Sequence, residues 1–140
     1  MTSTRSDKAV QSAEGLRELI ERHGMRESSD AARRLFAYLA LLEKWNESIN
    51  LTASTEWSSL AKLFEEALWA SRFYPQSRIT HMDIGSGAGF PAVPMRILRP
   101  AMRLRLVESR AKRAVFLETV ARELGLDHME VVCRRAEEYL

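Results

Sequence analysis

The sequence predicts an α/β fold in which a group of helices precedes a parallel β-sheet. In the first half, apolar residues recur at the spacing of amphipathic helices. In the second half, short apolar runs alternate with helical segments, which is typical of right-handed βαβ crossovers and parallel strands. A glycine-rich segment separates the first apolar run from the next helix. We therefore expect a binding site where that strand ends.

The N-terminal part is predicted to form a helical cap over residues 9–75, after a disordered polar tail over residues 1–8. Its first helix is expected from Ala9 to His23. The cluster Ser28-Ser29-Asp30 provides good N-capping residues for a second, long amphipathic helix. A third helix is expected to begin at Thr55 or Glu56 and to end near Pro75.

Residues 76–140 are predicted to form the first βαβαβ half of a Rossmann-like sheet. The expected elements are a buried strand Ile79–Ile84, a helix Pro91–Leu98, a strand Arg103–Glu108, a helix Ala111–Leu124 and a strand Met129–Cys133. In the Rossmann-like strand order 3-2-1-4-5 the first strand is central, but no fourth strand follows here. We therefore expect the chain to be the front part of a longer protein. The alternatives are a naturally shortened homologue, or a dimer that closes the sheet.

The segment from Asp83 to Pro91 is the strongest indication of a ligand. Gly85, Gly87 and Gly89 alternate with small residues between a strand and a helix, where a backbone can approach a nucleotide-type cofactor closely. A dinucleotide fingerprint would place its third glycine at the position of Phe90. The bulky ring disfavours a nicotinamide-dependent oxidoreductase. An acid followed by G-x-G-x-G instead resembles the S-adenosylmethionine loop of Rossmann-like methyltransferases, and the remaining alternative is a plain glycine-rich turn.

Acidic residues near the loop are further candidates for cofactor binding. Glu108 ends the second strand, at the distance beyond the loop where an acid binds ribose hydroxyls in nucleotide-binding folds. Asp83 is expected to be buried and to need a partner, either loop N–H groups or the ammonium of a cofactor. The tetrapeptide that begins at Arg135 follows the third strand and contains Ala136 and Glu137. For Glu108 a surface carboxylate is the alternative, and for the tetrapeptide a polar helix start.

Composition and the other reactive side chains exclude several classes of function. The net charge is +2, most basic residues are arginine, and no apolar run is long enough to span a membrane. The histidines lack the spacing of metal ligands, so no metal site is predicted. The single cysteine, Cys133, rules out an internal disulfide and is expected to be buried. Trp45, Trp57 and Trp69 lie at helical positions and are expected to pack in the core or between helices rather than to stack on bases. The default location is cytoplasmic.

Several motifs, in order along residues 30–140, resemble one family. They are Lys44-Trp45-Asn46, Asn50-Leu51-Thr52-Ala53, the segment Asp83–Pro91, Arg99-Pro100, Val107-Glu108-Ser109, Lys112-Arg113, Phe116-Leu117, Glu123-Leu124-Gly125-Leu126 and Arg135-Ala136-Glu137-Glu138. The chain is similar to the N-terminal two-thirds of RsmG (GidB) proteins, the bacterial methyltransferases that modify guanine N7 in 16S ribosomal RNA.

The resemblance implies a Rossmann-like S-adenosylmethionine-dependent methyltransferase fold with an N-terminal helical cap. It places cofactor contacts on Gly85, Phe90, Glu108, Ala136 and Glu137, with Arg135 close to that site. Together with Lys112 and Arg113, Arg135 is a candidate for holding RNA phosphate. The implied partners are 16S rRNA and the small ribosomal subunit, and the implied full-length protein is a monomer. Guanine N7 carries a lone pair, so methyl transfer needs positioning and electrostatic complementarity rather than a strong base, and no catalytic residue is assigned.

The chain departs from the family pattern at several positions. Leu63, Glu66 and Ala67 stand where the family usually has a histidine, an aspartate and a serine, and Ala92 replaces a glycine. The second half of the family sequence, including a further arginine near the cofactor, is absent. The alternative function is therefore a non-catalytic shortened homologue that binds RNA or a partner.

Overall fold

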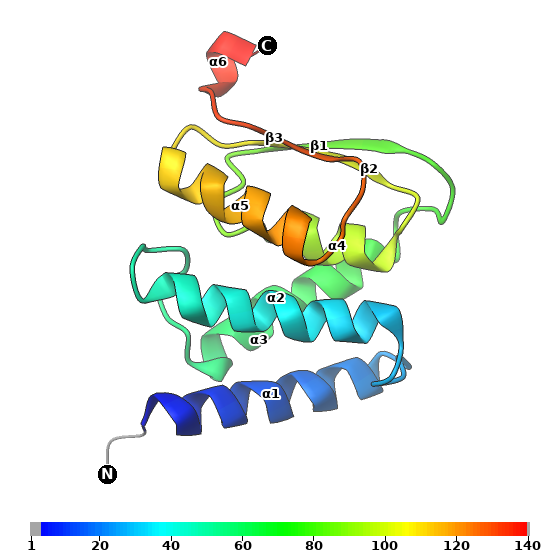
Figure 1. The fold of residues 1–140 in the computed structure, drawn as a ribbon. Coiled ribbons are helices and arrows are strands. Elements are labelled where there is room, and N and C mark those ends of the chain that lie inside the picture. The colour runs from blue at the N-terminus through cyan, green and yellow to red at the C-terminus, as the bar shows by residue number, and fades with distance from the viewer. Residues whose placement is uncertain (1–3, 140) are drawn as a thin grey trace.

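The computed structural model describes residues 4–139 and places the first five helices below a three-stranded sheet, with the short C-terminal helix above it (Figure 1). The elements in chain order are α1 (Arg5–Arg22), α2 (Asp30–Asn46), α3 (Trp57–Ser71), β1 (Thr80–Ile84), α4 (Ala92–Leu98), β2 (Arg103–Val107), α5 (Ala111–Glu123), β3 (Met129–Val132) and α6 (Ala136–Tyr139). The expected succession of three helices and a βαβαβ unit is confirmed.

The first helix begins earlier than the sequence predicted. Residues 5–8, expected to belong to a disordered tail, form its first turn. The reason is a capping box: the Thr4 side chain accepts a hydrogen bond from the Asp7 N–H, and the Asp7 carboxylate accepts one from the Thr4 N–H. The rest of the predicted tail, residues 1–3, lies outside the described residues.

The sheet is parallel with strand order β1-β2-β3, as expected for one half of a Rossmann-like sheet. Helices α4 and α5 lie on its lower face, between the sheet and helices α1–α3 (Figure 1). A continuous apolar core fills this space, with Tyr38, Phe64 and Phe116 among its largest fully buried side chains. One core therefore joins the helical cap to the sheet.

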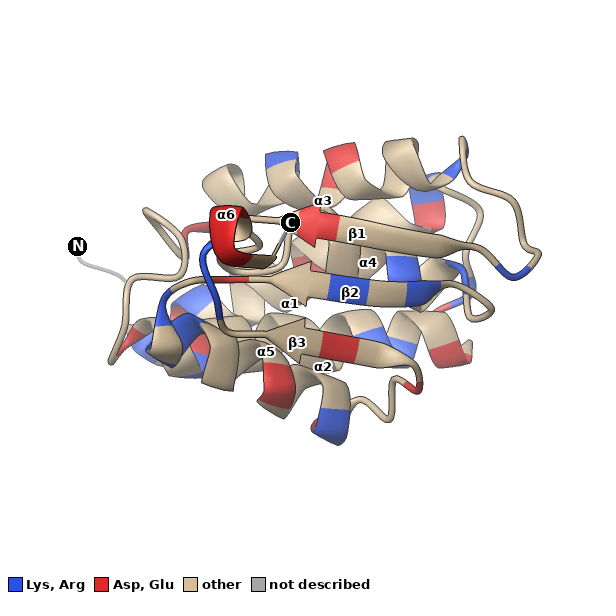
Figure 2. Cartoon of the chain, turned by 90° about the horizontal axis from the view of Figure 1, so that it is seen from above, with Lys and Arg blue, Asp and Glu red and all other residues tan. Residues whose placement is uncertain are grey.

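The opposite face of the sheet is largely uncovered by the described residues, and this corrects one prediction. β1 was expected to be buried, but Met82 and Ile84 point away from α4 and are 38% and 50% exposed. Among the described residues, only the short α6 lies over this face (Figure 2). A separate prediction is also wrong: Cys133, expected to be buried at the end of the third strand, is exposed just after β3.

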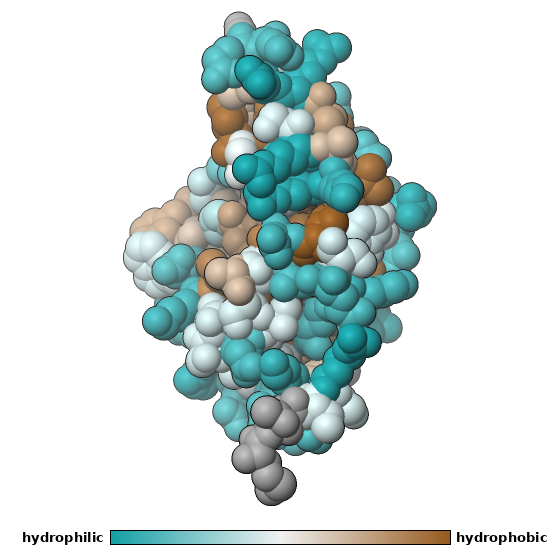
Figure 3. Space-filling model, turned by 90° about the vertical axis from the view of Figure 1, so that its left-hand side faces the viewer, coloured by the Kyte–Doolittle hydropathy of each residue, from teal (hydrophilic) through white to brown (hydrophobic). Residues whose placement is uncertain are grey.

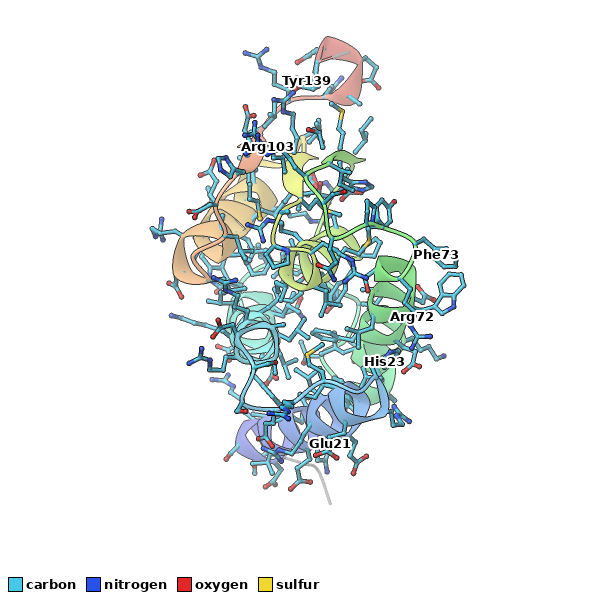
Figure 4. The ribbon with its side chains drawn as sticks, turned by 90° about the vertical axis from the view of Figure 1, so that its right-hand side faces the viewer. Glu21, His23, Arg72, Phe73, Arg103 and Tyr139 are labelled. Atoms are coloured by element: carbon cyan, nitrogen blue, oxygen red, sulfur yellow. The ribbon has the colours of Figure 1, made fainter. Side chains whose placement is uncertain are left out.

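The far end of the molecule, where the strands begin, exposes aromatic residues of α3 and the segment after it. Trp69, expected to pack in the core or between helices, is 56% exposed and contacts the exposed Phe73 edge to face at 4.9 Å between ring centroids. Phe73 projects from this end near Arg72, whose guanidinium lies 3.2 Å from His23 Nδ1 (Figure 4). Among residues 4–139, no helix is long and apolar enough to cross a membrane.

Candidate cofactor site

The candidate site lies where the three strands end. All strands run in the same direction, so their carboxyl ends meet at one edge of the sheet, beside α6 (Figure 2). The glycine loop and the segments after β2 and β3 start from this edge. The edge is where ligands bind in open α/β sheets.

The glycine loop is held in place by main-chain hydrogen bonds to β2. The N–H groups of Gly85 and Ser86 donate to the Val107 carbonyl at 2.8 and 3.3 Å. Gly89 N–H closes the next turn on the Ser86 carbonyl at 2.7 Å. Because these bonds use backbone groups, the loop presents little side-chain bulk. The space where a Cβ atom of Gly85 would stand has no other atom within 4 Å.

Glu108 is the residue that connects the loop to β2. Its side chain is buried, and its two carboxylate oxygens accept hydrogen bonds from Gly87 N–H at 2.9 Å and from Arg110 N–H at 3.0 Å. The carboxylate therefore lies under the loop, and its contact with a ribose stays a prediction. Sequence reasoning did not find its contact with Gly87, because the loop conformation decides which N–H faces the acid.

Asp83 lies on the side of β1 that faces the helices. Its Oδ2 atom is buried and has no hydrogen-bond partner among the described residues. Burial raises the pKa of the Asp83 carboxyl, and the Glu108 carboxylate acts in the same direction, while Ser86 and His81 oppose the shift. An unpartnered buried carboxylate oxygen is costly, and a cationic ligand group would satisfy it.

Tyr38 of α2 contacts the glycine loop, and the sequence did not predict this contact. Its buried hydroxyl donates to the Ala88 carbonyl at 2.6 Å, and burial, with the nearby Asp83 charge, raises its pKa well above the usual range. Phe90 packs against Tyr38 and Phe64 at ring-centroid distances of 5.3 and 5.0 Å. The helical cap thus supports the loop directly. The only signal for this role in the sequence is that Tyr38 falls on the apolar face of α2, which is expected to be buried.

A cavity of about 350 Å³ opens beside the loop and brings together several predicted residues. Gly85 lines it together with Arg135, Ala136 and Glu137 from the segment after β3. Gly89 and Phe90 do not line it. They lie beneath the loop, where a Cβ atom on Gly89 would stand 2.7 Å from the Val93 Cγ2 atom.

The three predicted RNA-contacting residues differ in their surroundings. Lys112 is exposed at the start of α5, and Arg135 is exposed at the cavity beside the loop. Arg113 donates through Nη2 to the Asn50 carbonyl at 2.9 Å and so ties α5 to the α2–α3 loop. Within the described part of the chain, no group of three or more His, Cys, Asp or Glu residues is arranged to hold a metal ion.

Comparison with known proteins gives a consistent match. The family described as "GidB: rRNA small subunit methyltransferase G" matches residues 31–140. Ribosomal RNA small subunit methyltransferase G of Geobacillus sp. (strain WCH70) is 40% identical over 86% of this chain and 52% of its own length. The proteins of the same name from Nitrosospira multiformis and Pelotomaculum thermopropionicum are 40% and 38% identical, over 92% and 90% of this chain.

These relatives are longer than the chain. The alignments cover 57% of the Nitrosospira protein and 54% of the Pelotomaculum protein. The chain thus spans about half the length of the relatives it matches, where the sequence suggested two-thirds.

Proposed function

We propose that this chain, which belongs to the rRNA small subunit methyltransferase G family, binds S-adenosylmethionine at the glycine loop as part of an rRNA methyltransferase. The finer proposal is methylation of a guanine N7 in 16S rRNA of the small ribosomal subunit, in the cytoplasm. The observation that supports it most is the glycine loop hydrogen-bonded to the buried Glu108 beside an open cavity.

The residues at the loop fit the chemical groups of this cofactor. Gly85 leaves room for close approach of a ligand to the backbone, and Ala136 and Glu137 line the opposite side of the cavity. The unpartnered Asp83 Oδ2 suits a cationic group such as the cofactor's ammonium. When bound, the cofactor supplies an electrophilic methyl group on a sulfonium. The chain's own contribution would be to position cofactor and RNA, since guanine N7 needs no strong base.

Calorimetric titration of the folded chain with S-adenosylmethionine and S-adenosylhomocysteine tests the cofactor assignment. We expect both to bind. A folded chain that binds neither would refute cofactor binding by these residues. Transfer of a labelled methyl group to 16S rRNA and to assembled small subunits, compared side by side, tests the substrate.

The Glu108→Ala variant tests the site itself. Loss of the carboxylate removes a charge-assisted acceptor for the cofactor and leaves the Gly87 N–H without its partner. We expect cofactor binding to weaken by roughly 1–3 kcal/mol. Glu108→Gln, which keeps one oxygen acceptor, should lose less. Unchanged affinity in Glu108→Ala would show that Glu108 does not contact the cofactor.

The second candidate function is non-catalytic binding of RNA or a partner by this chain alone. The uncovered upper face of the sheet, with exposed Met82 and Ile84, is the observation that favours it. RNA binding without detectable cofactor binding or methyl transfer would support this alternative over the first.

A further inference from the structure

An apolar groove runs between the C-terminal end of α2 and the start of α5. Trp45, Ile49 and Val115 are among the residues that line it, and we call it the α2–α5 groove. Its volume is about 480 Å³, which is within the range of pockets that hold small ligands. Val115 is 49% exposed there.

The walls of the groove are fixed by contacts between the two helices. The Trp45 and Phe116 rings meet edge to face at 5.7 Å between centroids. Arg113 on α5 donates to the Asn50 carbonyl in the loop after α2. A groove with such walls is preformed, so a ligand would not have to order it.

The charges at the groove favour an anionic occupant. Lys44 from α2 and Lys112 from α5 both line it and are exposed. The acidic Glu47, one helical turn after Lys44, is already paired with Arg5 at 3.1 Å. An apolar surface lined by two exposed ammonium groups matches a nucleotide, which has a base with flat aromatic faces and an anionic phosphate.

The groove lies at the same end of the molecule as the cofactor cavity. α5 begins at Ala111, three residues after Glu108, and Ser109 between them lines the cavity beside the glycine loop. Figure 1 places the start of α5 and the end of α2 on the side where the strands end. Seen from that side, apolar surface is exposed among hydrophilic residues across the middle of the molecule (Figure 3).

We propose that the α2–α5 groove binds an unstacked nucleotide of the RNA substrate, with the base against Trp45 and Val115 and the phosphate between Lys44 and Lys112. The proposal rests on the proposed function, because it assigns the substrate a place beside the cofactor site. It adds a contact that the motifs did not indicate: Lys44 and Lys112 act as a pair across the groove.

The test measures binding of a fluorescein-labelled single-stranded RNA. Its length is about 12 nucleotides, which is within the range that single-stranded nucleic-acid-binding domains cover. Val115→Glu places a negative charge in the groove, and Val10→Glu is the matched control on the exposed face of α1, where Val10 is 55% exposed. We expect Val115→Glu to weaken RNA binding about tenfold, as loss of one stacked base would. The control should bind like the parent chain.

Charge is tested separately with Lys44→Gln and Lys112→Gln, with the exposed Lys62→Gln on α3 as the control. If a groove lysine contacts a phosphate, replacing it with Gln should make the negative slope of log affinity against log salt shallower by about 0.7. Lys62→Gln should leave the slope unchanged.

Calorimetry with S-adenosylmethionine separates this inference from the proposed function. The Val115→Glu chain should keep its cofactor affinity and its unfolding midpoint, so a selective loss of RNA binding supports the groove. Equal RNA binding by Val115→Glu and the parent chain would overturn it. So would a Val115→Glu chain whose sedimentation mass falls while RNA binding persists, because the groove would then be a contact between copies of the chain.

Discussion

At the residue scale, the glycines of the loop differ in what they do. Gly87 has a φ of +55°, and a Cβ atom there would meet only the Gly85 carbonyl oxygen, at an ordinary contact distance of 4.0 Å. Gly89 has a φ of +98°, and a Cβ atom there would lie 2.7 Å from the Val93 Cγ2 atom and 3.1 Å from the Tyr38 hydroxyl. Gly87 is therefore required by backbone conformation alone, and Gly89 by conformation and by packing.

This difference predicts a graded effect of alanine at the two positions. Gly87→Ala should reduce the free energy of unfolding by about 1 kcal/mol, the strain of a left-handed alanine. Gly89→Ala should reduce it by about 3 kcal/mol, since the clash beneath the loop adds to that strain. Urea denaturation of both variants measures the two values. A smaller loss for Gly89→Ala than for Gly87→Ala would contradict the packing described beneath the loop.

Asp83 predicts a dependence of stability on pH. Because burial raises the pKa of its carboxyl above the ordinary 3.8, the folded chain holds this proton more tightly than the unfolded chain. The contribution of the Asp83 carboxyl to the free energy of unfolding is therefore fully present below pH 3.8, and it is lost as pH rises through the raised pKa. Asp83→Asn should thus be more stable than the parent at pH 7, and the difference should shrink as pH falls toward 3.8.

Urea denaturation over this pH range measures the effect, with the exposed Glu118→Gln on α5 as the control. A parent chain that is more stable than Asp83→Asn at pH 7 would show that the carboxylate is favourably paired. The same variant should bind S-adenosylmethionine more weakly if Asp83 meets the ammonium, so gain of stability and loss of affinity should appear together.

At the element scale, periodicity and capping residues determined most of what the sequence could predict. Ser29 caps α2 through the Ala32 N–H, as its place in the Ser-Ser-Asp cluster suggested. The start of α1 was misjudged because the polarity of residues 1–8 concealed the Thr4–Asp7 capping box. The loop and Glu108 were found from spacing. Tyr38 and the α2–α5 groove were not, because they depend on how helices distant in sequence pack against the sheet.

The contact of α2 with the glycine loop predicts an effect of Tyr38→Phe. The variant keeps the ring but leaves the buried Ala88 carbonyl without its donor. We expect a loss of about 1–2 kcal/mol in the free energy of unfolding and weaker cofactor binding, because the loop loses its support from the cap. Tyr74→Phe is the control, since the Tyr74 ring contacts His81 and no hydrogen bond of its hydroxyl is present within residues 4–139. Identical cofactor affinity in Tyr38→Phe and the parent would show that the Tyr38 contact does not contribute to cofactor binding.

At the scale of the whole molecule, the arrangement of the sheet leaves one edge and one face open. Ile79 and Gly85 direct their main-chain hydrogen bonds to β2, through Arg103 N–H and the Val107 carbonyl. Because these directions alternate along a strand, Thr80, Met82 and Ile84 direct theirs outward, where the described residues provide no partner strand. An exposed edge beside exposed apolar side chains is a template for pairing with another chain.

The open edge predicts concentration-dependent self-association of this chain, in contrast to the monomer that the family resemblance implies for the full-length protein. Met82→Lys places a charge on the open face next to the edge, and we expect it to shift the chain toward monomer in sedimentation velocity experiments. Val10→Lys, at a site of comparable exposure on α1, should associate like the parent. If the parent chain stays monomeric at high concentration, the outward N–H and C=O groups of β1 are satisfied by water, and the edge is no contact site. If Met82→Lys and Val10→Lys reduce association equally, general charge rather than the β1 edge controls it.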